Sequence, residues 1–361
     1  MIDAHIHLWD PRVTPRIVSP AVKLLGWNPD LLKRMAGALF PASSLDFVGK
    51  PDEVIVPYLP GKWLGDTLAA PSGPTWDRPA VEGFVHVEAS WQTGGKALGE
   101  VDETRWLEEV CGQDLLGIVG AATLEADNVE ELVAAHRGAS RRFVGVRDKL
   151  ASSSQKGVED WKKTLHAPMR NAAWRRGFER LGELDVAFDA WVYGEQLREL
   201  TEVCRSTPST RVVLDHLGTP VALGGPVAGL GRTEAERTDI AKRWHDDLAR
   251  LAELPHVYAK VSGLTMPIVG WDFHERTAPP SVLEVVDRLG QHIVHALQCF
   301  GPERCIIASN FPMDRVSVRW STWMAALQKL LEGESAEVRA NLFGGNARRF
   351  YRLDSVSNEI E

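Results

Sequence analysis

The sequence predicts an α/β fold, a single (β/α)8 TIM-like barrel with a long insertion after its first strand. Three observations predict it. Short β-branched runs recur eight times, helical patterns follow most of them, and polar side chains stand where the runs end. The chain has 361 residues, a length that suits one barrel with insertions. Strands alternating with amphipathic helices imply parallel βαβ units, and eight such units imply a closed barrel.

The eight expected strands are short and spread along the whole chain. They cover residues 2–8, 83–90, 117–124, 143–147, 186–193, 211–217, 257–264 and 305–311. Between them, apolar residues recur at intervals of three and four, as in residues 104–113, 128–138 and 281–301. An open doubly wound sheet is the alternative, but no strand is followed by a Gly-x-Gly-x-x-Gly turn or a P-loop.

One domain is expected over residues 1–353, followed by a polar tail at 354–361. Residues 9 to about 82 form the insertion, which contains a helical pattern at 31–40, and a Gly-rich segment at 218–240 follows the sixth strand. Both segments follow the C-terminal end of a strand, the face where barrel enzymes form their active sites. We therefore expect them to be lids or substrate-binding walls.

Composition limits the partners. The net charge is −8 without a basic stripe, which disfavours nucleic acid. No apolar run reaches the ~20 residues that cross a bilayer, and the start of the chain lacks a signal-peptide pattern. The cysteines, Cys111, Cys204, Cys299 and Cys305, suit reduced, buried thiols of a cytoplasmic protein. A small-molecule substrate is expected, and a homo-oligomer is left open.

His5 and His7 are the strongest candidates for an active site. Residues i and i+2 of a strand point to the same face, so both imidazoles share one face near the end of the first strand. Barrel interiors are usually filled by Val, Ile and Leu, and inward imidazoles need a partner such as a metal or a substrate. Two hydrogen-bonded core histidines are the alternative.

The same parity rule predicts polar side chains near the ends of the other strands. These are His86, Glu88, Arg147, Asp189, Trp191, Tyr193, His216, Lys260, Ser262 and Asn310. Glu88 and Asp189 have a structural alternative, as ion pairs with Arg147 or Lys260 inside the barrel. As a group, they are hard to explain by packing alone.

Several motifs resemble those of the amidohydrolase-2 family, in its lactonase-like branch of L-fuconolactonases and pyrone-dicarboxylate lactonases. They are IDAHIHLWDP, FDAWVYGEQLREL, LDHLGTP, YAKVSGL, ASNFPMD and LFGGNARRFYRL, in family order from residue 2 to residue 353. The resemblance implies a TIM-like barrel that hydrolyses at a carboxyl carbon or, in decarboxylase branches, releases CO2. It carries the family's first-strand pair to His5 and His7, its sixth-strand histidine to His216 and its eighth-strand acid to Asn310.

Asn310 departs from the family pattern, which commonly has Asp there as general base and metal ligand. A carboxamide cannot take a proton from water near neutral pH. The fifth strand also lacks the histidine of the full pattern. Both losses argue against a binuclear metal site. His5, His7 and His216 then either hold one divalent metal, with Zn2+ the best candidate, or polarise a carbonyl without metal.

The working hypothesis is hydrolysis of a lactone or similar ester of a small carboxylated or hydroxylated acid. Arg147 or Lys260 would hold a substrate carboxylate, His86 and Asp189 would add polar contacts, and Trp191 and Tyr193 would form a wall. Asp314, Glu88 and Asp189 are the candidates for the base that activates water.

Two alternatives remain open at this point. A metal-dependent decarboxylase of a phenolic or unsaturated acid would use the same barrel. A non-catalytic ligand-binding barrel would explain the missing acid at Asn310.

Overall fold

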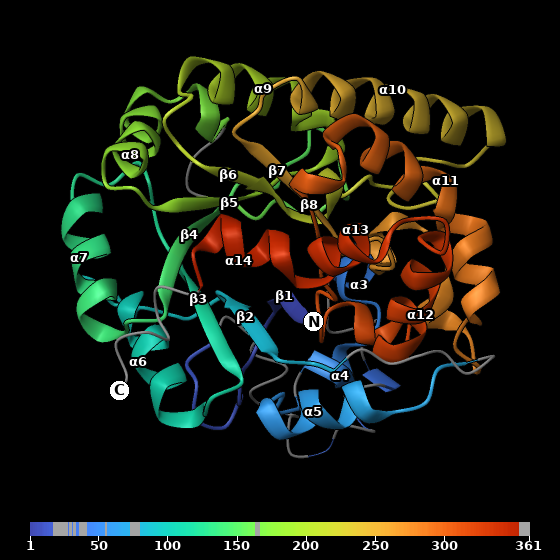
Figure 1. Cartoon of the computed structure of the whole chain (residues 1–361), viewed down its shortest axis with the longest axis horizontal. Helices are drawn as coiled ribbons and strands as arrows, with labels where there is room; N and C mark the ends of the chain where they lie inside the picture. The colour runs from blue at the N-terminus through green and yellow to red at the C-terminus, as the bar shows by residue number, and fades with distance from the viewer. Residues whose placement is uncertain are drawn as a thin grey trace.

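The computed structural model describes residues 1–16, 28, 31, 34–35, 42–54, 56–72, 80–162 and 167–353. Eight parallel strands form one sheet in the order of the chain (Figure 1). They are β1 (Ile2–Ile6), β2 (Gly83–Val87), β3 (Leu115–Ala121), β4 (Phe143–Lys149), β5 (Ala187–Trp191), β6 (Val212–Leu214), β7 (Val257–Val261) and β8 (Cys305–Ile307). The predicted (β/α)8 architecture is confirmed.

The sheet closes between its first and last strands just beyond the end of β8. The amide of Asn310 donates to the carbonyl of His5 at 2.9 Å, and the amide of His7 donates to the carbonyl of Phe311 at 2.8 Å. A parallel bridge joins Ile6 to Phe311 between these bonds. The seam therefore lies beside the two histidines that the sequence singled out.

Several predicted strand boundaries were wrong. β3 begins two residues earlier than expected, and β4 continues to Lys149. β6 was expected to run through Leu217 but ends at Leu214, where a 3-10 turn over Asp215–Gly218 replaces extended backbone. β8 was expected to reach Phe311 and ends at Ile307. A β-branched run does not reveal where the backbone leaves the sheet, because the residues that follow β6 and β8 are buried as completely as the strands.

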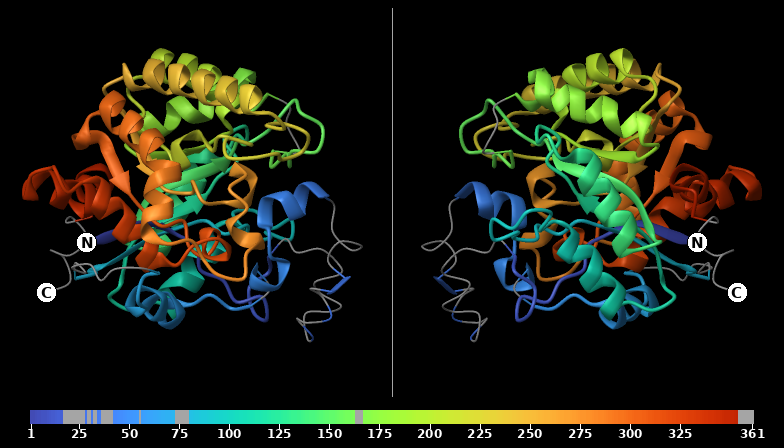
Figure 2. Two further views of the ribbon diagram at one scale, coloured as in Figure 1. Left: turned by 90° about the vertical axis from the view of Figure 1, so that its right-hand side faces the viewer. Right: turned by 90° about the vertical axis from the view of Figure 1, so that its left-hand side faces the viewer.

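Helices pack around the outside of the barrel. The main ones are α6 (Val101–Val110), α7 (Val129–Ala139), α8 (Ala172–Glu183), α9 (Leu197–Ser206), α10 (Glu234–Ala252), α11 (Val282–Phe300) and α12 (Trp320–Leu330). The insertion after β1 contributes α3 (Ala42–Val48), α4 (Pro51–Val54) and α5 (Pro60–Leu68). α3 lies beside the short helix Pro267–Val269 that follows β7 (Figure 2). The expected helix at 31–40 lies mostly outside the described residues, and so does the tail at 354–361.

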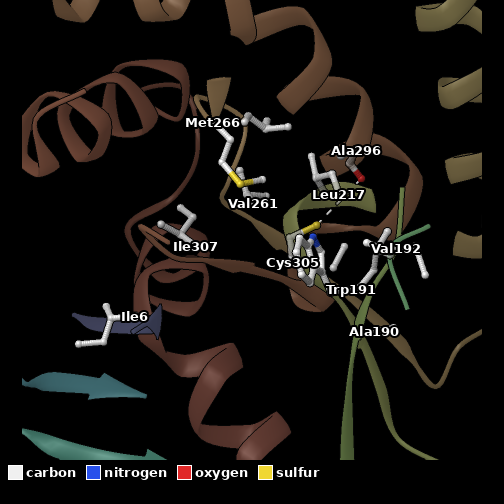
Figure 3. Close-up of a cluster of buried hydrophobic side chains, with 14 of the residues drawn as sticks. Ile6, Ala190, Trp191, Val192, Leu217, Val261, Met266, Ala296, Cys305 and Ile307 are labelled. Carbon is white, nitrogen blue, oxygen red and sulfur yellow. Dashed lines mark hydrogen bonds between the residues drawn. The ribbon is translucent and has the colours of Figure 1, made fainter. Parts of the chain in front are cut away.

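Two apolar layers hold the barrel. Inside it, Ile2 and Ala187, the first residues of β1 and β5, pack with Phe350 and Tyr351 of α14 (Asn346–Tyr351), after the short α13 (Ala336–Ala340). α14 therefore covers the amino end of the barrel and leaves the carboxyl end for the site. The larger outer layer lies between sheet and helices, and Figure 3 shows part of it around Met266, Trp191 and Ile307.

The structure tests only some of the expectations about membrane spans, cysteines, location and assembly. None of the helices in the described ranges is long and apolar enough to span a membrane. The four cysteines are free, as expected, but only Cys204 and Cys305 are buried, while Cys111 and Cys299 are partly exposed. The domain limits, the cytoplasmic location, the small-molecule partner and a homo-oligomer stay predictions.

Asp3 ties the barrel seam to the helices outside it. Its side chain is completely buried and points away from the barrel axis. Its carboxylate accepts hydrogen bonds from the Ser309 amide at 2.9 Å, the Ser309 hydroxyl at 2.7 Å and the Trp320 indole at 2.8 Å. The Trp63 indole of α5 lies 3.4 Å away. One carboxylate thus joins β1, the segment after β8, α5 and α12.

We predict that Asp3→Ala destabilises the protein by about 3 kcal/mol, because it leaves several buried donors without an acceptor. Urea unfolding followed by tryptophan fluorescence measures the change. Asp246→Ala is the matched control, since it removes only an exposed pair with Lys242 on α10 and should leave the midpoint unchanged. An equal midpoint for the Asp3 variant and the wild type would contradict the structural role of Asp3.

Candidate active site

A β-bulge in β1 turns two histidines into the barrel. Against β2, Asp3 pairs with Phe84 and Ile6 with His86, so β1 uses one residue more than its neighbour between these points. Asp3 and Ile6 both face the outer layer, which leaves His5 and, beyond the strand end, His7 on the inner side. Their Nε2 atoms lie 3.2 Å apart, and His7 Nδ1 lies 2.7 Å from the carbonyl of Val87. The predicted shared face is confirmed.

A left-handed turn after β6 brings a second pair of side chains to the same place. His216 and Leu217 have φ values of 56° and 50°, which side chains with a Cβ rarely adopt. The turn fits because residue 263 is glycine: a Cβ there would stand 2.4 Å from the His216 ring. The ring centroids of His216 and His5 are 4.5 Å apart, and His216 Nδ1 bonds the Ser262 hydroxyl at 2.9 Å.

Asp215 was missed by the sequence analysis, and the structure places it in the histidine group. In a regular strand, Asp215 and His216 would point to opposite faces, but the turn aims both inward. Donor atoms of His5, Asp215 and His216 all lie within 4.8 Å of one another. Asp215 Oδ1 lies 3.3 Å from His5 Nδ1 and 3.1 Å from Lys260 Nζ. Neither carboxylate oxygen accepts a well-aligned hydrogen bond from the described residues.

The protonation states of this group follow from burial and nearby cations. Burial and Lys260 hold the pKa of His5 well below 6.5, and burial and Arg147 do the same for His7. Burial lowers the pKa of His216 to about 3. Burial alone would raise the pKa of Asp215, but Lys260 and His5 outweigh it and hold that pKa well below 3.8. Near neutral pH the site therefore holds three neutral imidazoles and one carboxylate.

The structural alternative for Glu88 and Asp189 is correct. Arg147 Nε donates to Glu88 Oε1 at 2.8 Å, and its Nη2 donates to the Glu88 carbonyl at 2.8 Å. Lys260 pairs with Asp189, which also accepts from the Tyr351 hydroxyl at 2.8 Å. Both acids are held by cations inside the barrel, so neither is placed as a free base. Burial raises the pKa of Asp189 to about 6 despite Lys260.

Asp314 holds Asn310 and does not reach the histidines through any contact in the described residues. Asp314 accepts from the Thr265 amide at 2.9 Å, from the Thr265 hydroxyl, and from Asn310 Nδ2 at 2.6 Å. Burial raises the pKa of Asp314 to about 7. Asn310 has a left-handed φ of 60°, and its buried Oδ1 has no hydrogen-bond partner in the described part of the chain. The fixed amide thus offers one free acceptor at the seam.

Two of the predicted substrate contacts, His86 and Tyr193, lie away from the histidine group, and a third, Trp191, lies near it. His86 Nδ1 accepts from the Leu8 amide at 3.2 Å, and its Nε2 lies 3.5 Å from Glu103 of α6, so the parity prediction fails for it. The Tyr193 hydroxyl donates to the Glu159 carbonyl at 2.9 Å in the outer layer. Trp191 packs on Phe47 and Trp161 and lies 5.4 Å from the Arg147 guanidinium. Only Trp191 stands close to the histidine group, as the wall prediction requires.

The donor set fits one divalent metal ion. The carbonyl of Val87 requires a proton on His7 Nδ1, which leaves the Nε2 lone pair of His7 facing His5 Nε2. His5 Nδ1 lies 3.1 Å from Lys260 Nζ and 3.3 Å from Asp215 Oδ1. If Nδ1 accepts from Lys260, His5 Nε2 donates to His7 Nε2; if Nδ1 instead carries a proton toward Asp215, two imidazole lone pairs face each other at 3.2 Å and need a proton or a cation between them. The two Asp215 oxygens, which have no hydrogen-bond partner in the described residues, and the closeness of His5, Asp215 and His216 also suit a metal ion. Arg147 Nη1, 3.5 Å from His5 Nε2, would repel the positive charge of such an ion.

Comparison with known proteins agrees with the geometry. The family model described as Amidohydrolase matches residues 2–353. An L-fucono-1,5-lactonase of Burkholderia multivorans is 30% identical over 256 residues, which cover 70% of this chain and 77% of that protein. A zinc-bound crystal structure of a B. multivorans amidohydrolase superposes with a TM-score of 0.68 and 23% identity, over 97% of this chain and 98% of that one.

A second solved structure supports the fold. A Pseudomonas putida protein described as a 2-pyrone-4,6-dicarboxylic acid hydrolase superposes with a TM-score of 0.56 and 18% identity, over 98% of this chain and 97% of that one. The resemblance drawn from the motifs is therefore confirmed. The barrel, the histidine group and the family match agree: the chain belongs to the amidohydrolase family and is a hydrolase of the amidohydrolase superfamily.

Proposed function

We propose that this protein hydrolyses an uncharged, hydroxylated lactone of a small acid. The observation that carries the proposal is the group of His5, His7, Asp215 and His216 at the carboxyl ends of β1 and β6. Neutral imidazoles beside a carboxylate suit proton transfer at an ester carbonyl. The likeness to an L-fucono-1,5-lactonase supports this reaction class.

The charges inside the barrel favour a neutral substrate over a dicarboxylate. Arg147 and Lys260 lie beside His5, and Lys149 shares Glu88 with Arg147; each of the three already pairs with Glu88, Asp189 or Asp215. A substrate carboxylate would have to displace one of these acids and leave it buried without a partner, which is costly. The sequence suggested that Arg147 or Lys260 holds a substrate carboxylate. In this proposal they hold the buried carboxylates of Glu88, Asp189 and Asp215 instead.

His5 and Asp215 are the best placed pair to take the proton of the attacking water. In the tautomer that carries its proton on Nδ1, toward Asp215 Oδ1 at 3.3 Å, His5 has a lone pair at Nε2; Lys260 Nζ, 3.1 Å from Nδ1, then pairs with the two carboxylates beside it. The proton of water passes to Nε2 as the water oxygen bonds to the carbonyl carbon, and Asp215 stabilises the imidazolium that results. The ring C–O bond then breaks, and the leaving oxygen takes a proton to give the hydroxy acid.

Arg147 is placed to stabilise the negative charge that develops on the carbonyl oxygen. Two of its nitrogens are fixed by Glu88, and the third, Nη1, faces His5 Nε2 and Asp215. A fixed donor in a buried site stabilises an oxyanion more than a mobile one, because it needs no reorganisation. Asn310 Oδ1 is a free acceptor at the same seam, suited to a substrate hydroxyl.

A metal ion held by His5, His7 and His216 would lower the pKa of a bound water and polarise the carbonyl. Because such an ion would occupy the lone pair of His5, Asp215 would then be the group that accepts the proton of the water. The histidines are 0 to 5% exposed, so side chains above them must move to admit a substrate.

A panel of aldonolactones and a pyrone dicarboxylate tests the reaction class. We expect acid release from neutral five- or six-membered sugar lactones, and turnover of the dicarboxylate lower by ~100-fold or more, since the described cations inside the barrel already pair with Glu88, Asp189 and Asp215. A pH indicator follows acid release, and trapped CO2 reports decarboxylation of phenolic acids. CO2 without lactone hydrolysis, or no turnover of any compound, would overturn the proposal.

We predict that Asp215→Asn lowers kcat by roughly 10^3-fold while the fold is kept, because the amide cannot stabilise a charged His5. Asp314→Asn is the matched control, a buried carboxyl held by Thr265 and Asn310, and it should lower kcat by less than ~10-fold. Circular dichroism and melting temperature check that both variants fold. If Asp314→Asn is the inactive variant, the base assignment passes to Asp314.

Metal content is a separate prediction. Protein purified without chelator should contain about one zinc or manganese per chain, and His5→Ala or His216→Ala should remove it. Inductively coupled plasma mass spectrometry measures the content. His256→Gln is the control, since that half-exposed ring bonds only the Cys204 carbonyl in the described structure. Metal that persists in both site variants would place it elsewhere.

A further inference from the structure

A cavity of about 230 Å³ lies on the rim of the barrel, apart from the histidine group. Its walls come from three segments that follow different strands: the insertion after β1, the segment after β7 and the segment after β8. The residues are Lys50, Phe273, Arg276, Thr277, Pro279 and 315–319. Loops after β1, β7 and β8 meet only at the carboxyl face of a barrel, so the cavity opens on the same face as the site.

The walls of this cavity are basic in a chain that is acidic overall. Lys50, Arg276, Arg315 and Arg319 line it, and none of its described lining residues is Asp or Glu, although the net charge of the chain is −8. Acids outside the lining hold two of the four cations. Arg315 pairs with Glu53 and Asp66, and Arg276 pairs with Glu284.

The other two cations have no acidic partner. No Asp or Glu of the described residues lies within ion-pair distance of Lys50 or Arg319, and Arg319 Nη1 donates only to the Ala70 carbonyl at 3.3 Å. Lys50 also lines a neighbouring cavity that contains Asp46, Asp52, Asp272 and Glu275, but none of these acids forms a described ion pair with it. The positive charge of Lys50 and Arg319 is therefore not balanced by a direct contact, and an anion bound in the cavity would balance it.

Two further features add hydrogen-bond donors. The hydroxyl of Ser317, a lining residue only 3% exposed, has no partner in the described part of the structure. Val318 and Arg319 immediately precede α12, an 11-residue helix whose N-cap Arg319 supplies no side-chain hydrogen bond to the first-turn amides. The amino end of a helix carries free N–H groups and partial positive charge, which favour an anion.

We propose that this cavity binds a small oxyanion, a phosphate or carboxylate group. Four cations, a buried hydroxyl without a partner and an uncapped helix start match an anion with several acceptor oxygens. The volume admits such a group with a few water molecules. The ligand is distinct from the uncharged lactone and would sit one turn beyond Asp314, which holds Asn310.

Isothermal titration with inorganic phosphate and with succinate tests the proposal, at low chloride and with sodium chloride of equal ionic strength as the blank. The double variant Lys50→Gln/Arg319→Gln removes the two cations that form no described ion pair. No buried acid therefore loses a partner in this variant. We expect it to weaken binding at least ~10-fold, and Ser317→Ala to weaken it several-fold. Lys242→Gln/Arg243→Gln on α10 removes the same charge elsewhere and should leave the affinity unchanged.

The relative affinity of phosphate and succinate identifies the anionic group, and tight binding of either supports the site. Absence of heat beyond the chloride blank in the wild type would overturn the proposal. So would an affinity that falls equally in the cavity variant and in the α10 variant, since that result reports only net charge. The readout is binding, so it is independent of whether the barrel hydrolyses lactones.

Discussion

The buried charges inside the barrel determine how the rest of the site is built. Lys260 is completely buried, and Asp189 and Asp215, which both lie beside it, offset the cost of burying its charge. Asp215 also lies beside His5, and the hydroxyl of Tyr351 from α14 donates a hydrogen bond to the carboxylate of Asp189. The C-terminal helix, the first strand and the sixth strand are thus joined through one ionic network. Removing one member would leave another as an uncompensated buried charge.

That network also explains why several polar residues are not available to a substrate. Inside the barrel, each carboxylate is needed to hold a cation and each cation to hold a carboxylate. Among the described side chains around the histidine group, Asp215 and Asn310 keep oxygens without well-aligned donors. Capacity left over in a buried site is where a ligand is expected to bind. The chemistry is therefore concentrated at the ends of β1, β6 and β8.

Much of the fold could be predicted from the sequence, because eight β-branched runs with helical intervals leave few alternatives to a barrel. That His5 and His7 share one face was predictable as well, from the period of a strand, but the β-bulge in β1 is what turns that face into the barrel. Asp215 was not, because strand parity assigns neighbours 215 and 216 to opposite faces, and only the left-handed turn beside Gly263 reverses this. His86 failed for a related reason: a bulge in β1 shifts the pairing with β2, and its ring meets the Leu8 amide. Local irregularities, which a regular period cannot reveal, decided both.

Asn310 shows how the acid at the end of β8 has been rearranged. Asp314 stands four residues later and holds the Asn310 amide at 2.6 Å, while burial raises the pKa of that acid to about 7. A carboxyl group of this kind is partly protonated near neutral pH and adds little negative charge to the seam. Asp215, in contrast, stays ionised because Lys260 and His5 lie beside it. The carboxylate of the proposed site is therefore supplied from β6, and the position after β8 provides an oriented, uncharged acceptor. An uncharged acceptor beside neutral imidazoles matches a hydroxylated lactone better than an anion.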